Sequence, residues 1–176
     1  PLETLYQSIT ARPSFVPYDQ LPQTYIDAVL SVEDSRFVHH HGVDPLSIAR
    51  ALWADLRSGT LAEGGSTITQ QLAKNTLFTQ EKHLARKAAE MFAALAIEKQ
   101  YNKEQIFEMY VNTIYFGSGH YGIGEAAQGY FGKTPLQLTD AEAVMLAGLP
   151  NAPSAYSPDN NLELALQRMG QVLDSM

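Results

Sequence analysis

The stretch GGSTITQQLAKNTLFTQEKHLARKAAEMFAALAIEK, residues 64–99, contains two helical patterns in succession. Its paired glycines interrupt the chain, and the Ser-Thr pair that follows is typical of a helix start. Ile68 and Leu72 then lie four apart, as on the inner face of a helix. The opposite, polar face holds Thr67, Gln71 and Lys74.

A longer helical pattern runs from about Lys82 to Gln100. Its apolar positions predict an inner face made of Leu84, Ala88, Met91, Phe92 and Leu95. Arg86 and Glu90 are four apart on a different face, so two functional side chains can lie side by side there.

An earlier apolar stripe at Leu21, Tyr25 and Val29 predicts a helix that ends near Asp34 and has Glu33 at the end of its stripe. A carboxyl group packed against apolar neighbours is expected to have a raised pKa and can exchange a proton. The alternative is an ordinary acidic residue at a solvated helix end.

Asp44 followed by Pro45 predicts the start of another helix, which continues to Gly59. Its apolar residues predict a buried face made of Leu46, Ala49, Leu52, Trp53 and Leu56.

Further helices are predicted from Asn102 to Ile114, from Thr139 onward and over about 162–173. A tightly turned or mobile loop is expected at Gly117, Gly119, Gly122 and Gly124. With six or more helices and no predicted strand, we expect a mainly α fold and a single domain over 1–176.

Twelve Lys and Arg against nineteen Asp and Glu leave a net charge of −7, which argues against nucleic-acid binding. The absence of cysteine excludes disulfides and Cys-ligated zinc, and three successive histidines lack the spacing of a metal site. The longest apolar run near the middle is too short to span a bilayer. The chain begins with Pro1, so we expect a fragment of a longer protein.

Two pairs of interpretations stay open on the residues alone. The glycines before Thr67, with Lys74 two turns on, suit a phosphate or pyrophosphate, but a plain turn and helix cap explain the glycines equally well. Glu90 is either the second carboxylate of a sugar-processing site with Glu33 or the partner of Arg86 in a surface ion pair.

Five ordered segments within about residues 20–160 resemble the peptidoglycan glycosyltransferase family, glycosyltransferase family 51. This is the transglycosylase domain of class A penicillin-binding proteins and of monofunctional transglycosylases. The segments are EDSRFVHHHG from Glu33, GGSTITQQLAKN from Gly64, RKAAEMFAALAIEK from Arg86, KEQIFEMYVNTIYFG from Lys103 and LTDAEAVMLAGLPNAPSAYSP from Leu138.

The resemblance implies a lysozyme-like, two-lobed helical domain with an extended cleft. It also implies polymerisation of lipid II into β-1,4-linked glycan strands, with inversion at the donor anomeric carbon and release of lipid pyrophosphate. Glu33 would be the general base, supported by Asp34. Glu90 would be the second carboxylate, which either orients the donor pyrophosphate or assists the leaving group. The resemblance places cations for the pyrophosphate at Lys74, Lys82 and Arg86.

The resemblance further assigns substrate-binding positions to Thr67, Gln71 and Asn75. It places a flap at about 57–63, and it makes Phe37 and His40 shape the first segment's turn, mainly as structural residues. It implies no organic cofactor and leaves open a divalent cation, Mg²⁺ or Mn²⁺, near Glu90.

The expected partners are lipid II, the growing glycan chain, the membrane surface, a linked transpeptidase domain and cell-wall synthesis proteins. The expected location is the extracytoplasmic face of the bacterial cytoplasmic membrane. Candidates for the membrane contact are Leu52, Trp53, Leu56 and Leu61, although we expect Leu52 in the core. The alternatives are a lysozyme-like glycan-cleaving enzyme, which does not need pyrophosphate-binding cations, and an inactive glycan- or lipid-binding module.

Overall fold

Local capping chemistry explains where several helices begin. At Thr67, Asn102 and Thr139, a side-chain oxygen accepts a hydrogen bond from the backbone N–H three residues on. In each case the Gln or Glu at that third position accepts from the backbone N–H of the capping residue. These reciprocal bonds satisfy donors that a helix start otherwise leaves unpaired. Asp44 caps the helix that begins at Pro45 with a single side-chain bond, which it accepts from the N–H of Leu46, two residues on.

The structure is a computed structural model that describes residues 2–59, 65–78 and 84–176. Its α-helices in these ranges are α1 (Leu5–Thr10), α2 (Gln23–Glu33), α3 (Pro45–Ser58), α4 (Ile68–Leu77), α5 (Leu84–Gln100), α6 (Lys103–Val111), α7 (Ile123–Phe131), α8 (Asp140–Gly148), α9 (Pro153–Tyr156) and α10 (Leu162–Ser175). Short 3-10 turns are η1 (Leu2–Thr4), η2 (Tyr18–Gln20), η3 (Pro135–Gln137) and η4 (Leu149–Asn151). Extended pairing in the described ranges is limited to one isolated bridge, Tyr115 with Tyr121. The predicted mainly α fold is confirmed.

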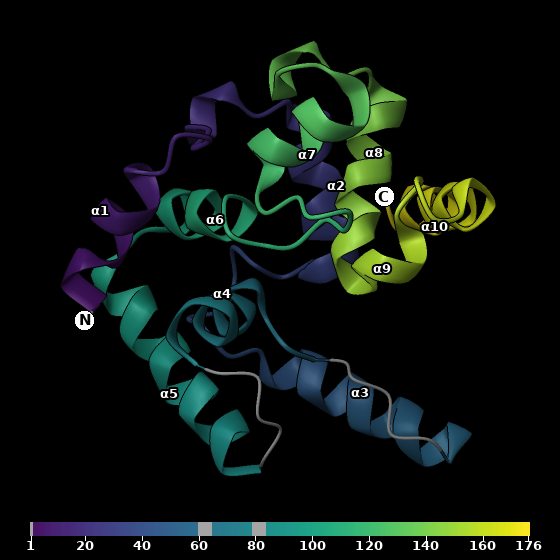
Figure 1. Ribbon diagram of the computed structural model, residues 1–176. Helices are drawn as coiled ribbons and strands as arrows, with labels where there is room; N and C mark the ends of the chain where they lie inside the picture. The colour runs from purple at the N-terminus through teal and green to yellow at the C-terminus, as the bar shows by residue number, and fades with distance from the viewer. Residues whose placement is uncertain (1, 60–64, 79–83) are drawn as a thin grey trace.

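The helices form two groups (Figure 1). In one group, α2 packs against α8 and α10. In the other, α4 packs against α5, with α3 extending beside them. α6 packs against α4 and contributes Ile106, Phe107 and Tyr110 to the common core. No described helix is long and apolar enough to cross a membrane.

Asp34 joins the end of α2 to the beginning of α4. Its buried carboxylate oxygen Oδ2 accepts a hydrogen bond from the backbone N–H of Ile68 at 3.1 Å, and it lies 2.7 Å from His40 Nε2. The N–H of Gly42 donates to His40 Nδ1, so Nε2 carries the proton that is donated to Asp34. Because Ile68 is the first residue of α4, the carboxylate also lies at the positive end of that helix.

Thr67 closes the same network from the other side. Its hydroxyl donates to the carbonyl of Gly42 at 2.6 Å while it caps α4. Gly42 has a φ of +110°, and a Cβ there would lie 2.8 Å from the carbonyl oxygen of Ala94 in α5. Glycine is therefore required where this loop passes against α5. Phe37 and His40 are both buried in the turn, as expected for structural residues.

The predicted buried face of α3 is wrong. Helix bounds and cap agree with the prediction, but Leu52, Trp53 and Leu56 are 58%, 64% and 80% exposed, and no residue of α3 is buried. Leu46 is also exposed. The reason is tertiary: α3 extends away from the rest of the helices (Figure 1). Its apolar stripe is therefore left exposed. The expectation that Leu52 is a core residue is overturned.

The inner face predicted for α5 also needs correction. Phe92 is 74% exposed, Leu95 and Ala88 are exposed too, and the buried residues of the described helix face include Glu90, Ala94 and Ile97. α5 packs against α4 through the side that carries Glu90. Ion pairs with Arg86 and Lys87 compensate the charge of the buried Glu90 carboxylate.

We predict that Asp34→Ala lowers the free energy of unfolding by about 2–4 kcal/mol, because it leaves two buried donors without an acceptor. Chemical denaturation monitored by circular dichroism measures this. Ser35→Ala, on the exposed neighbour, is the control and should change stability by less than about 0.5 kcal/mol. Equal stability of the two variants would show that the Asp34 network does not hold α2 to α4.

Candidate functional site

Glu33 is the last residue of α2 and continues the buried stripe of Tyr25 and Val29. Burial raises the pKa of its carboxyl group, and the negative charge of Asp34 acts in the same direction. A hydrogen bond from Gln71 and the positive charge of Arg168 on α10 lower the pKa but do not cancel the effect of burial. The predicted raised pKa is confirmed in direction. Such a carboxyl group takes up a proton more readily than an ordinary glutamate, as a general base must.

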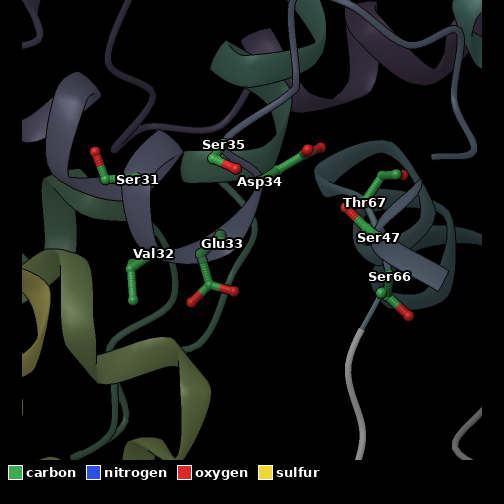
Figure 2. Close-up of a pocket in the computed structure, with 9 residues that line it drawn as sticks. Ser31, Val32, Glu33, Asp34, Ser35, Ser47, Ser66 and Thr67 are labelled. Atoms are coloured by element: carbon green, nitrogen blue, oxygen red, sulfur yellow. The ribbon is translucent and has the colours of Figure 1, made fainter. Parts of the chain in front are cut away.

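The two carboxylates at the end of α2 point in different directions (Figure 2). Glu33 and Asp34 both line a cavity together with Ser31, Ser35, Ser47, Ser66 and Thr67. Asp34 points across toward the segment at Thr67, where the junction described above uses its oxygen. Asp34 and Thr67 are thus both engaged in hydrogen bonds within the protein, and their predicted substrate-binding roles stay predictions.

Gln71 on α4 lies directly beside Glu33. Its amide nitrogen Nε2 donates to Glu33 Oε2 at a long 3.5 Å, and its oxygen Oε1 accepts from the hydroxyl of Tyr110 at 3.0 Å. The other carboxylate oxygen, Glu33 Oε1, is buried and has no hydrogen-bond partner among the described residues. The family resemblance assigned Gln71 to substrate binding, which stays a prediction; the structure places its amide beside the Glu33 carboxylate.

A second pocket, of about 450 Å³, gathers cations at the far end of α4. It is lined by Arg12, Lys74, Asn75, Phe78, Arg86, Thr113, Tyr115 and Tyr121. Lys74 and Asn75 follow Gln71 by three and four residues, so one face of α4 leads from Glu33 to these cations. The structure thus brings together three of the predicted residues, Lys74, Asn75 and Arg86.

Arg12 is a residue that the sequence analysis missed. It follows α1, and its guanidinium donates to the carbonyl of Asn112 at 3.3 Å. Nothing in its local sequence marks it, because it lies 62 residues before Lys74 and outside the basic region of the chain. Only the packing of α1 against α6 places it at this pocket.

Glu90 is held by two cations. Arg86 Nε lies 3.3 Å from Oε1 and Lys87 Nζ lies 3.6 Å from Oε2, with the Glu90 carboxylate almost fully buried. The ion pair with Arg86 therefore exists but is not on the surface. Lys87, which the sequence analysis did not select, also donates to the hydroxyl of Ser66 and so links α5 to the start of α4.

The surroundings of Glu90 do not form a resident cation site on their own. Both carboxylate oxygens face positive side chains, and no group of three His, Cys, Asp or Glu side chains suited to a metal is found over 2–59, 65–78 and 84–176. A divalent cation near Glu90 stays a prediction, and no step below depends on it.

Some of the predicted residues lie in parts of the chain that the structure does not describe. Lys82 and Leu61 lie outside the described residues, as does most of the predicted flap at 57–63. Of that flap, Arg57 and Ser58 belong to α3, and Gly59 ends the helix in a left-handed conformation with a φ of +68°.

The predicted glycine-rich loop is tightly turned over residues 117–122, but Gly124, which was also expected in the loop, lies in the first turn of α7. Gly117, Gly119 and Gly122 all have positive φ angles, and the turn brings the rings of Tyr115 and Tyr121 to 4.6 Å between centroids. This aromatic pair forms one wall of the cation pocket.

The chain is similar to known proteins of one family. A family model described as Transglycosylase matches residues 2–176. The chain is 47% identical over 173 residues to penicillin-binding protein 1A of Aquifex aeolicus, which covers 98% of this chain and 24% of that protein. It is 48% identical over 161 residues to penicillin-binding protein 1A of Escherichia coli, which covers 92% of this chain and 19% of that protein.

A crystal structure of penicillin-binding protein 1A from Haemophilus influenzae matches with a TM-score of 0.53 and 26% identity. The match covers 92% of this chain and 14% of that one. The chain therefore spans a quarter or less of the length of these relatives.

We predict that Glu33→Gln stabilises the protein at neutral pH. The folded state holds the Glu33 proton more tightly than the unfolded state does, so the stability that this group contributes is present below pH 4.5 and is lost as the pH rises through the raised folded pKa. Glutamine does not ionise and avoids that loss. Thermal unfolding from pH 4 to pH 8 should show a stability advantage of Glu33→Gln that grows with pH.

Glu104→Gln is the matched control, because Glu104 is exposed in the first turn of α6. It should give no advantage that grows with pH. If Glu33→Gln and Glu104→Gln change the thermal stability equally at every pH, the pKa of Glu33 is not raised in the folded state.

Proposed function

The chain belongs to the transglycosylase family, and from this premise we propose that it is a peptidoglycan glycosyltransferase that polymerises lipid II into β-1,4-linked glycan strands. The observation that carries the proposal is the single face of α4 that joins a buried carboxylate to a pocket of cations. A base and an anion-stabilising site are the two elements that transfer of a sugar from a pyrophosphate requires.

In the proposed reaction, Glu33 is the general base. It removes the proton from the 4-hydroxyl of the acceptor sugar as that oxygen forms a bond to the anomeric carbon of the donor. The bond between the anomeric carbon and the phosphate oxygen breaks, and its electron pair leaves with the lipid pyrophosphate. Attack from the side opposite the leaving group inverts the anomeric centre from α to β.

The cations of the second pocket are proposed to stabilise the leaving pyrophosphate. Lys74 and Arg86 line the pocket, and Arg12 adds a third positive side chain to it. Positive groups already in place cost no reorganisation when negative charge develops on the phosphate. Asn75 can donate a hydrogen bond to the same anion, and Lys82 is proposed as a further cation on the basis of the family resemblance.

Glu90 is proposed to act on the donor side of the site. Its carboxylate holds Arg86 and Lys87 in place, so it orients cations toward the pyrophosphate. A divalent cation, if one is used, would be bound together with the substrate's phosphates, which supply the oxygen ligands that such ions prefer. Gln71 and Thr67 contribute to the site mainly through the contacts they make within the protein.

The setting of the reaction follows from the relatives. Because they are penicillin-binding proteins, we propose that this domain works in a longer, membrane-anchored protein with a linked transpeptidase domain and among other cell-wall synthesis proteins. Lipid II and the growing glycan chain would be reached at the extracytoplasmic face of the cytoplasmic membrane. The exposed apolar stripe of α3 is proposed to rest on that membrane surface.

The decisive experiment incubates the purified chain with labelled lipid II, with and without Mg²⁺ or Mn²⁺, and separates the products by gel electrophoresis. We expect polymer ladders from the wild-type chain and at least a roughly hundredfold loss of rate in Glu33→Gln, since only proton transfer is removed. Unchanged turnover of Glu33→Gln would eliminate Glu33 as the base. Addition of a chelator shows whether a divalent cation is required.

The same assay separates a transferase from a glycan-cleaving enzyme. A hydrolase would cleave preformed glycan and would not depend on a cation at Lys74, whereas Lys74→Ala should slow polymerisation on the order of tenfold or more. Lys99→Ala is the matched control, because Lys99 is exposed at the far end of α5. Cleavage of glycan without polymer formation would favour the hydrolase.

We predict that replacing Trp53 and Leu56 together by serine weakens binding to phosphatidylethanolamine–phosphatidylglycerol vesicles by roughly tenfold or more, since two large apolar side chains no longer enter the interface. Flotation of the chain with the vesicles measures this. Leu136→Ser is the control, because Leu136 is also exposed but lies in η3. Equal flotation of both variants would exclude α3 as the membrane contact.

A further inference from the structure

Tyr110 is a buried residue of α6 that the sequence analysis assigned to no site. Its ring is fully buried, and its hydroxyl donates to Gln71 Oε1 at 3.0 Å. Gln71 in turn donates through Nε2 to Glu33 Oε2. These bonds run in one direction, from α6 through α4 to the end of α2, and they finish at the carboxylate.

The direction of this chain follows from the chemistry of its members. Burial raises the pKa of Tyr110 well above its ordinary value, so its hydroxyl stays protonated and is available as a donor. The amide of Gln71 has one accepting end and one donating end. With its oxygen occupied by Tyr110, its NH₂ group is the end that faces Glu33.

We infer that Tyr110 is a positioning residue for the base, which acts by anchoring Gln71 so that its amide N–H groups face the carboxylate of Glu33. The inference rests on the proposed function of Glu33 as the general base. Gln71 is correspondingly assigned to the base rather than to the substrate. Neither residue exchanges a proton with the substrate in this scheme.

The anchoring of Gln71 by Tyr110 affects Glu33 because some neighbouring groups raise the pKa of its carboxyl group and others lower it. Burial and the negative charge of Asp34 disfavour ionisation of Glu33, while Gln71 on α4 and Arg168 on α10 favour its ionised form. The protonated hydroxyls of Tyr25 on α2 and Tyr110 on α6 also lie near the carboxylate. Glu33 Oε1 accepts no hydrogen bond within the described residues, so Gln71 supplies the one side-chain donor recorded there for the carboxylate. Without its anchor, the Gln71 amide is free to leave, and burial then acts on the carboxyl group with less opposition.

Tyr110→Phe tests the inference, because it removes the hydroxyl and keeps the ring. We expect the Glu33 carboxyl to titrate at higher pH, measured by carbon-13 NMR of labelled glutamate with Glu33→Gln identifying the resonance. We also expect the acidic limb of the polymerisation rate to move to higher pH. At pH values on the acidic limb, the variant's rate should be about threefold to tenfold lower than that of the wild type, the effect of one hydrogen bond. At high pH, where Glu33 is ionised in both, the two rates should be equal.

Tyr25→Phe is the matched control. Tyr25 is also a fully buried tyrosine near Glu33, but its hydroxyl has no hydrogen-bond partner among the described residues. Removing the Tyr25 hydroxyl should leave the pH at which Glu33 titrates unchanged. Circular dichroism and thermal unfolding verify that both variants fold.

A double-mutant cycle with Gln71→Met separates positioning from a general structural role. If Tyr110 acts through Gln71, Tyr110→Phe has no further effect on the Glu33 titration once the amide is absent. Equal shifts in both backgrounds, or no shift from Tyr110→Phe alone, would overturn the inference. The NMR titration does not depend on turnover, so a wild-type chain that makes no polymer but shows the expected coupling refutes the proposed function and leaves the positioning of Glu33 by Tyr110 intact.

Discussion

The carboxylate of Asp34 is the interaction on which the geometry of the site depends. One of its oxygens accepts from the first N–H of α4 and from His40, so the residue that directly follows α2 and the first turn of α4 are held together at hydrogen-bond distance. Gln71 lies one turn into α4 and therefore arrives beside Glu33, the residue before Asp34. The cations follow along the same helix. A functional base and its anion site thus share one structural attachment point.

The burial of carboxylates in the site costs stability but suits the chemistry that we propose for them. Glu33 is part-buried, with its oxygen Oε1 covered, and this desolvation disfavours its charge and raises its pKa. Glu90 is buried as well, but two cations compensate its charge. These two acids therefore differ in environment as their proposed roles require: one is ready to accept a proton, and the other holds positive groups toward the donor.

The two apolar faces that were wrongly assigned, on α3 and α5, have a common explanation. Helical periodicity detects an apolar stripe but does not say what covers it. The stripe of α3 carries Trp53 and Leu56 outward, where the proposed membrane surface supplies the apolar environment that the core would otherwise provide. On α5, the ion pairs of Glu90 let a charged residue take the packed side while Phe92 points outward. Both departures coincide with the proposed sites of contact with substrate or membrane.

What the sequence by itself determined is local. The helix starts at Thr67, Asn102 and Thr139 follow from capping chemistry within four residues, and the family follows from ordered segments such as EDSRFVHHHG. Tertiary structure decided which groups meet: Tyr110 reaches Gln71, 39 residues away in the chain, and Arg12 joins Lys74 in one pocket. The physical reason is range. Caps and periodicity act over one or two turns, whereas a buried hydrogen bond or a shared pocket depends on how helices distant in sequence pack in space.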